Sequence, residues 1–93
     1  MNETKLLIGS LSNDLQRVAV SIHRGSYPTA ERFLKEANRW VLDLEEYPVK
    51  EYIQKILTDL KKNRPKNIKS LEIAEKYLMY SILLQNYALH LPQ

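Results

Sequence analysis

The spacing of apolar residues along the chain predicts four amphipathic helices. They are expected over residues 3–24, 28–46, 49–62 and 70–91. Within each segment, apolar residues recur three and four positions apart, which places them on one side of a helix. In the first helix this side consists of Ile8, Leu11, Leu15, Val18 and Ile22. The chain is therefore expected to be all-α.

Residues that commonly start and stop helices agree with these limits. Asn2 or Thr4 can cap the first helix, and Gly25 suits the left-handed residue just past its end. Pro48 ends the second helix and starts the third, because proline lacks the backbone N–H that a helix interior needs. Ser70 can cap the fourth helix.

The connections between the four helices are only a few residues long. Short connections make consecutive helices antiparallel neighbours. The sequence therefore predicts a single domain over residues 1–93, folded as a small antiparallel four-helix bundle of up-down-up-down order. A more orthogonal packing of the same four helices is the alternative.

The last predicted helix is apolar around more of its circumference than the others. Met79, Ile82 and Leu83 lie among polar residues, on the side where a surface helix carries charge. Tyr80 and Tyr87 lie seven residues apart on one flank, which suits a protein–protein contact as well as a core. We expect a second chain to cover these positions, most simply in a homodimer. The predicted interface residues are Met79, Tyr80, Ile82, Leu83 and Tyr87.

Composition changes this picture little. The chain has 93 residues, of which 44% are hydrophobic and 27% charged, as in ordinary globular domains. It has no cysteine, which excludes disulfides and thiolate metal sites and fits a reducing compartment. It shows no signal-peptide pattern and no run of about 18 apolar residues that would span a membrane. A cytoplasmic protein without membrane partners is expected.

One short stretch is strongly basic. Residues 61–69 carry five basic side chains and no acidic one, although the net charge of the chain is only +3. The basic residues are Lys61, Lys62, Arg64, Lys66 and Lys69. They could contact the phosphates of a nucleic acid, so a nucleic-acid-binding accessory protein is an alternative function. The interpretation that we favour is a solvated link whose lysines complement the negative end of the third helix, because short basic links are common and the net charge is small.

No recognised catalytic, metal or cofactor pattern occurs. The two histidines, His23 and His90, lack the glutamate three residues earlier that dinuclear metal sites in helical bundles use. No serine lies in a Gly-x-Ser-x-Gly turn, and the two glycines are too far apart for a phosphate-binding loop. The leading hypothesis is therefore a non-enzymatic interaction module without cofactor or metal.

One pair of residues resembles a known motif. Arg17 and His23, in Arg-Val-Ala-Val-Ser-Ile-His, are separated by five residues, and the Arg–His motif of the HEPN family of helical ribonucleases is similar in spacing. In that family the motif usually lies late in the chain, whereas here it lies in the first helix. The resemblance implies an RNase in which Arg17 steadies a phosphate and His23 acts as acid or base.

Overall fold

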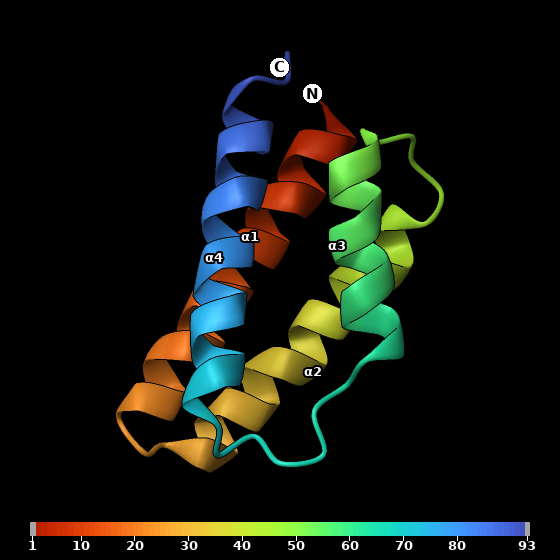
Figure 1. Cartoon of the computed structure of the whole chain (residues 1–93). Helices are drawn as coiled ribbons and strands as arrows, with labels where there is room; N and C mark the ends of the chain where they lie inside the picture. The colour runs from red at the N-terminus through yellow and green to blue at the C-terminus, as the bar shows by residue number, and fades with distance from the viewer. Residues whose placement is uncertain (1, 93) are drawn as a thin grey trace.

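The computed structural model describes residues 2–92 and contains four α-helices over this range (Figure 1). The helices are α1 (Glu3–His23), α2 (Tyr27–Leu44), α3 (Glu51–Lys62) and α4 (Leu71–Leu89). Each end lies within two residues of its predicted position, and the described residues contain no strand. The all-α prediction is therefore confirmed.

The ends of α1 and α4 show why the predicted limits hold. Asn2 caps α1, since its Oδ1 accepts a hydrogen bond from the Lys5 backbone N–H at 3.2 Å. Gly25 follows α1 with φ of 74°, a conformation that favours glycine. Ser70 caps α4 in the same way as Asn2 caps α1, by accepting from the Ile73 N–H at 3.3 Å.

The helix α1 lies at the centre of the molecule, because it packs along both α2 and α4. Two hydrogen bonds join it to the C-terminal part of the chain. The Asn2 side chain donates to the Pro92 carbonyl at 2.8 Å, and the Ser12 hydroxyl donates to the Ser81 carbonyl at 2.7 Å. The start of α1 therefore lies beside the end of α4, and both ends of the chain meet at one end of the molecule (Figure 1).

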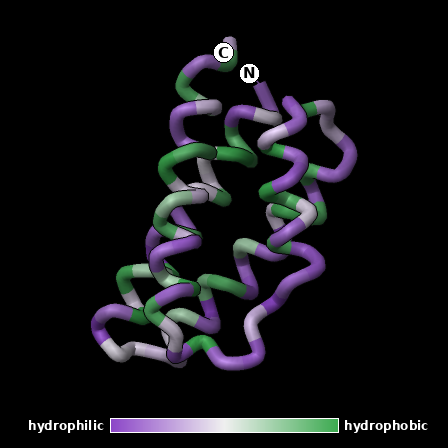
Figure 2. Tube along the Cα trace, viewed as in Figure 1, coloured by the Kyte–Doolittle hydropathy of each residue, from purple (hydrophilic) through white to green (hydrophobic). Residues whose placement is uncertain are grey.

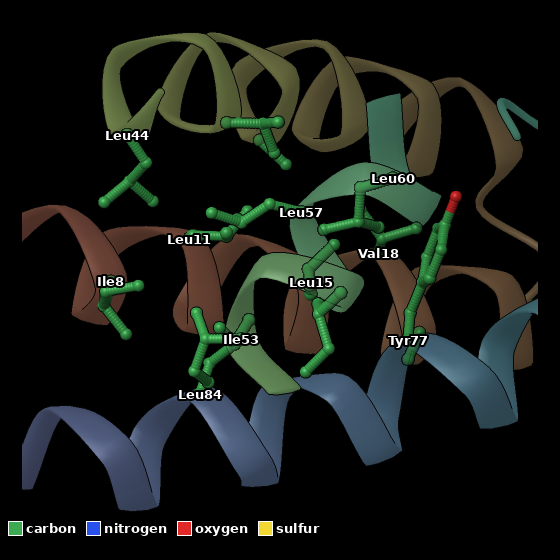
Figure 3. Packing of buried hydrophobic residues seen from close by; sticks show 14 of the residues in the cluster. Ile8, Leu11, Leu15, Val18, Leu44, Ile53, Leu57, Leu60, Tyr77 and Leu84 are labelled. Carbon is green, nitrogen blue, oxygen red and sulfur yellow. The ribbon is translucent and has the colours of Figure 1, made fainter. Parts of the chain in front are cut away.

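All four helices contribute to one core (Figure 3). The labelled side chains of α1 lie in the middle of this core (Figure 3). The helix α2 runs obliquely across one side of the molecule (Figure 1). The residues labelled in Figure 3 are Ile8, Leu11, Leu15, Val18, Leu44, Ile53, Leu57, Leu60, Tyr77 and Leu84. The packing is compact and compatible with a helical bundle. Across residues 2–92, no helix has the length and apolar character needed to cross a lipid bilayer.

Candidate interaction surface

The side of α4 that faces away from the core carries large apolar residues. Met79 and Ile82 are 52% and 53% exposed in this single chain. Hydrophobic positions recur along α4 (Figure 2), and some of them are buried in the core whereas others are exposed. We define the outer face of α4 by its exposed apolar residues, which are Leu71, Leu78, Met79, Ile82, Leu83 and Leu89.

The neighbours of α4 explain why this face stays open. The core side of α4 carries Tyr77 and Leu84, both almost fully buried. One flank meets α1 through Ser81, and the opposite flank meets α3 through Tyr80. Successive residues of a helix are turned by about 100°, so the positions around Ile82 point away from all three contacts.

The five predicted interface residues fall into two groups. Met79, Ile82 and Leu83 are exposed on the outer face. Tyr80 and Tyr87 instead contact α3 or the residue before it. The Tyr80 hydroxyl donates to Asp59 Oδ2 at 2.8 Å, and the Tyr87 hydroxyl accepts from the Lys50 backbone N–H at 3.3 Å. The two tyrosines thus hold α3 against α4 within the chain.

Asp59 is the centre of a polar network between α3 and α4. Burial alone would raise the pKa of its carboxyl group. Hydrogen bonds outweigh burial and lower the pKa below its ordinary value, and their donors are Asn63, Tyr80 and Lys76. Burial, together with the nearby Asp59 charge, raises the pKa of Tyr77 and of Tyr80 to about 12. This network fixes the flank of α4 that borders the outer face.

The polar residues of the outer face are distributed unevenly along α4. Its first half carries Glu72 and Glu75, and neither forms an ion pair with any described residue. Its second half carries Asn86 and ends at His90, whose Nδ1 lies 2.7 Å from the Asn86 carbonyl oxygen. A carbonyl only accepts hydrogen bonds, so Nδ1 donates here and Nε2 is left for another partner. The face is therefore acidic at one end only.

The basic stretch 61–69 is partly used within the chain. Lys61 forms an ion pair with Glu45, and Lys69 lies over the Tyr27 ring at 5.2 Å from its centroid. Ile68, in the same stretch, is buried in the core. The remaining three basic residues are exposed, and these are Lys62, Arg64 and Lys66.

Arg17 has a structural partner that the sequence analysis did not identify. Asp14 is buried in α1, with Arg17 Nη1 at 3.1 Å and with the Trp40 indole Nε1 donating to it at 2.8 Å. The nearby Asp14 carboxylate raises the pKa of Glu36 on α2. His23 is exposed at the last residue of α1. Asp14 thus ties Arg17 to the contact between α1 and α2.

Three residues of the outer face were missed by the sequence analysis. Leu71, Leu78 and Leu89 lie beside the predicted positions and extend the face along the whole helix. A spacing of seven separates Leu71 from Leu78 and Ile82 from Leu89, which is the repeat of a helix–helix seam. That repeat was the signal available in the sequence.

Residues 2–92 contain no cluster of three or more His, Cys, Asp or Glu side chains suited to a metal ion. Comparison with protein-family models, with curated proteins and with solved structures found no match to this chain.

Proposed function

We propose that this protein is a non-enzymatic interaction module that self-associates through the outer face of α4. The observation that carries the proposal is the row of six exposed apolar residues along one side of a single helix. Isolated apolar residues are normal on a protein surface, whereas six along one side of a single helix favour a contact site. Burial of the row against a second copy provides the driving force.

The size of this face predicts a modest affinity. Fully burying one large apolar side chain contributes roughly 1.5–3 kcal/mol, and the outer face offers six that are already partly covered. Association itself costs an estimated 4–15 kcal/mol. The 19 residues of α4 span about 28 Å, and one helix pair buries less than the roughly 800 Å² per partner of a standard interface. We therefore expect a dimer with a dissociation constant in the micromolar range.

The proposal includes the arrangement of the helices. We infer that the four helices follow the antiparallel up-down-up-down order. Support for α1 and α4 comes from the hydrogen bonds that join Asn2 to Pro92 and Ser12 to Ser81. Support for α1 and α2 comes from the bond of Trp40 to Asp14, which pairs the second half of α2 with the middle of α1. α4 packs along α1 and meets α3 on its other flank, which leaves its outer side unoccupied in the single chain.

Sedimentation equilibrium from about 1 to 200 μM tests the self-association. The parent chain is expected to form a dimer, and Ile82→Glu is expected to raise the dissociation constant at least tenfold, because it places a charge within an apolar contact. Leu42→Glu is the matched control, since Leu42 is 48% exposed on α2 and lies away from the outer face. This control is expected to leave the dissociation constant within twofold of the parent.

Two results would contradict the proposal. If the parent chain stays monomeric at 200 μM, the proposal of self-association is wrong. A dimer that Leu42→Glu weakens as much as Ile82→Glu places the contact elsewhere. Circular dichroism and thermal unfolding of both variants show whether they keep the fold, which is expected because both positions are exposed in the single chain.

A second candidate function rests on three exposed basic residues at the end of α3 and in the link that follows it. Lys62, Arg64 and Lys66 are close in the sequence and have no ion-pair partner among the described residues. If they bind nucleic acid, changing all three to Glu abolishes the binding, and affinity for a labelled duplex falls steeply between 50 and 200 mM salt. Absence of binding at 50 mM salt excludes this function.

A further inference from the structure

We propose that two copies of this chain pair their α4 helices antiparallel through the outer face, about a two-fold axis that lies between the two helices at the level of the Tyr80–Ser81 peptide bond. This inference rests on the proposed self-association and adds the orientation and register of the contact. In this arrangement the outer face of α4 contacts the same face of a second copy.

The positions of the apolar residues support this register. An antiparallel pair with its axis there brings together residues whose numbers add up to about 161. Leu71 then meets Leu89 of the second copy, Leu78 meets Ile82, and Met79 meets Leu83 or Ile82. Every residue of the outer face thus finds an apolar partner of similar size. A two-fold contact requires such self-complementarity, because each copy contributes the same surface.

The charges of the same face support the same orientation. In the antiparallel register Glu75 lies opposite Asn86 of the second copy, and Glu72 lies opposite His90. The acidic half of each helix therefore meets a half that carries no acidic residue and offers the Asn86 amide as a donor. The Asn86 and His90 side chains have no negative charge to repel the glutamates.

A parallel pairing of the same faces lacks this match between the acidic half of one helix and the non-acidic half of the other. It would place Glu72 and Glu75 of one copy beside the same two residues of the other, and like charges across a contact are unfavourable. It would also align the two helix dipoles, whereas an antiparallel pair sets each positive end beside a negative end. The uneven distribution of polar residues along α4 therefore selects the antiparallel arrangement.

Cross-linking tests the register directly, because the chain has no cysteine of its own. Glu75→Cys and Asn86→Cys chains are prepared separately, mixed, and oxidised with copper phenanthroline at a concentration where the parent is dimeric. The mixture is expected to give a disulfide-linked dimer, since positions 75 and 86 of opposite copies are adjacent in this register. Glu75→Cys alone is expected to remain uncross-linked, because its two copies lie about 16 Å apart along the helices and a disulfide spans less than about 7 Å between Cα atoms.

A charge substitution gives a second measurement that leaves the apolar contacts intact. Asn86→Lys is expected to tighten the dimer two- to fivefold, because the new charge faces Glu75 of the second copy. Asn86→Glu is expected to weaken the dimer by a similar factor. Asn86 is exposed, so both variants are expected to keep the monomer fold.

The outcomes separate this inference from the proposed function. Efficient cross-linking of Glu75→Cys alone, or a dimer weakened by Asn86→Lys, shows a parallel pair and overturns the inference while keeping self-association through α4. A dimer that gives no cross-link, and whose dissociation constant does not change with substitutions at position 86, uses another surface. This outcome overturns both the inference and the proposed function. A monomeric parent, seen in the sedimentation experiment, also overturns both.

Discussion

The helices α1 and α4 are nearly equal in length, at 21 and 19 residues, but they are used differently. α1 lies between two neighbours and buries polar residues, among them Asp14 and Ser12. α4 packs along α1, meets α3 through side chains such as Tyr80, and exposes residues as apolar as Ile82 and Leu89. The comparison shows that a helix's place in the fold, more than its own apolar content, determines which side chains meet water.

The buried polar groups of α1 are stable because each has a partner nearby. Ser12 donates to the Ser81 carbonyl, and Asp14 accepts from Trp40 and pairs with Arg17. A buried polar atom without a partner costs about 1–3 kcal/mol, so these contacts are what permits a central position. The exposed apolar groups of α4 have no such compensation within the chain, which is why we assign them to a contact between copies.

Truncating one leucine in α1 and one in α4 is expected to give the largest difference in the free energy of unfolding. Leu15→Ala in α1 is expected to lower the free energy of unfolding by about 3 kcal/mol, because Leu15 is fully buried and leaves a cavity. Leu78→Ala in α4 is expected to lower it by less than about 1 kcal/mol, because Leu78 is exposed in the single chain. Urea unfolding below 1 μM, where the monomer predominates, measures both. Equal losses would show that α1 is not the central helix.

Removing the buried carboxylate of α1 sharpens the comparison. Asp14→Ala is expected to lower the free energy of unfolding by about 2 kcal/mol, because the Trp40 N–H loses its acceptor and Arg17 loses its partner. Asn13→Ala is the matched control, since Asn13 is the exposed neighbour in the same helix and is expected to change stability by less than about 0.5 kcal/mol. An increase in the free energy of unfolding on Asp14→Ala would show that the buried carboxylate destabilises the fold.

The smallest effect is expected at alkaline pH, on the core side of α4. The pKa of Tyr77 is raised to about 12 in the folded chain, against about 10 in an unfolded chain. Between these values the unfolded state releases the proton first, so stability falls as pH rises. Urea unfolding at pH 9 and pH 11 measures how much stability the chain loses between the two. Tyr77→Phe is expected to make this loss about 1 kcal/mol smaller than in the parent. Tyr52→Phe, at an exposed tyrosine, is the control and is expected to leave the loss unchanged.

The local features of this chain were predictable from its sequence. Helix limits depend on residues close in the chain, so the cap at Ser70 and the left-handed turn at Gly25 could be identified without coordinates. The apolar spacing also placed Met79 and Ile82 on a side of α4 opposite its core, because that angle depends only on the helical repeat.

The sequence alone could not show which neighbour occupies a given side of a helix. Tyr80 and Tyr87 lie on a flank of α4 that the helical repeat defines, but only the packing of α3 decides that this flank is covered. Asp14 looks like one polar residue beside an apolar seam, and its burial depends on Trp40, which is 26 positions away in the chain. Residue periodicity thus determined the helices and their faces, whereas tertiary packing decided which faces meet, because contacts between distant segments leave no periodic trace in the sequence.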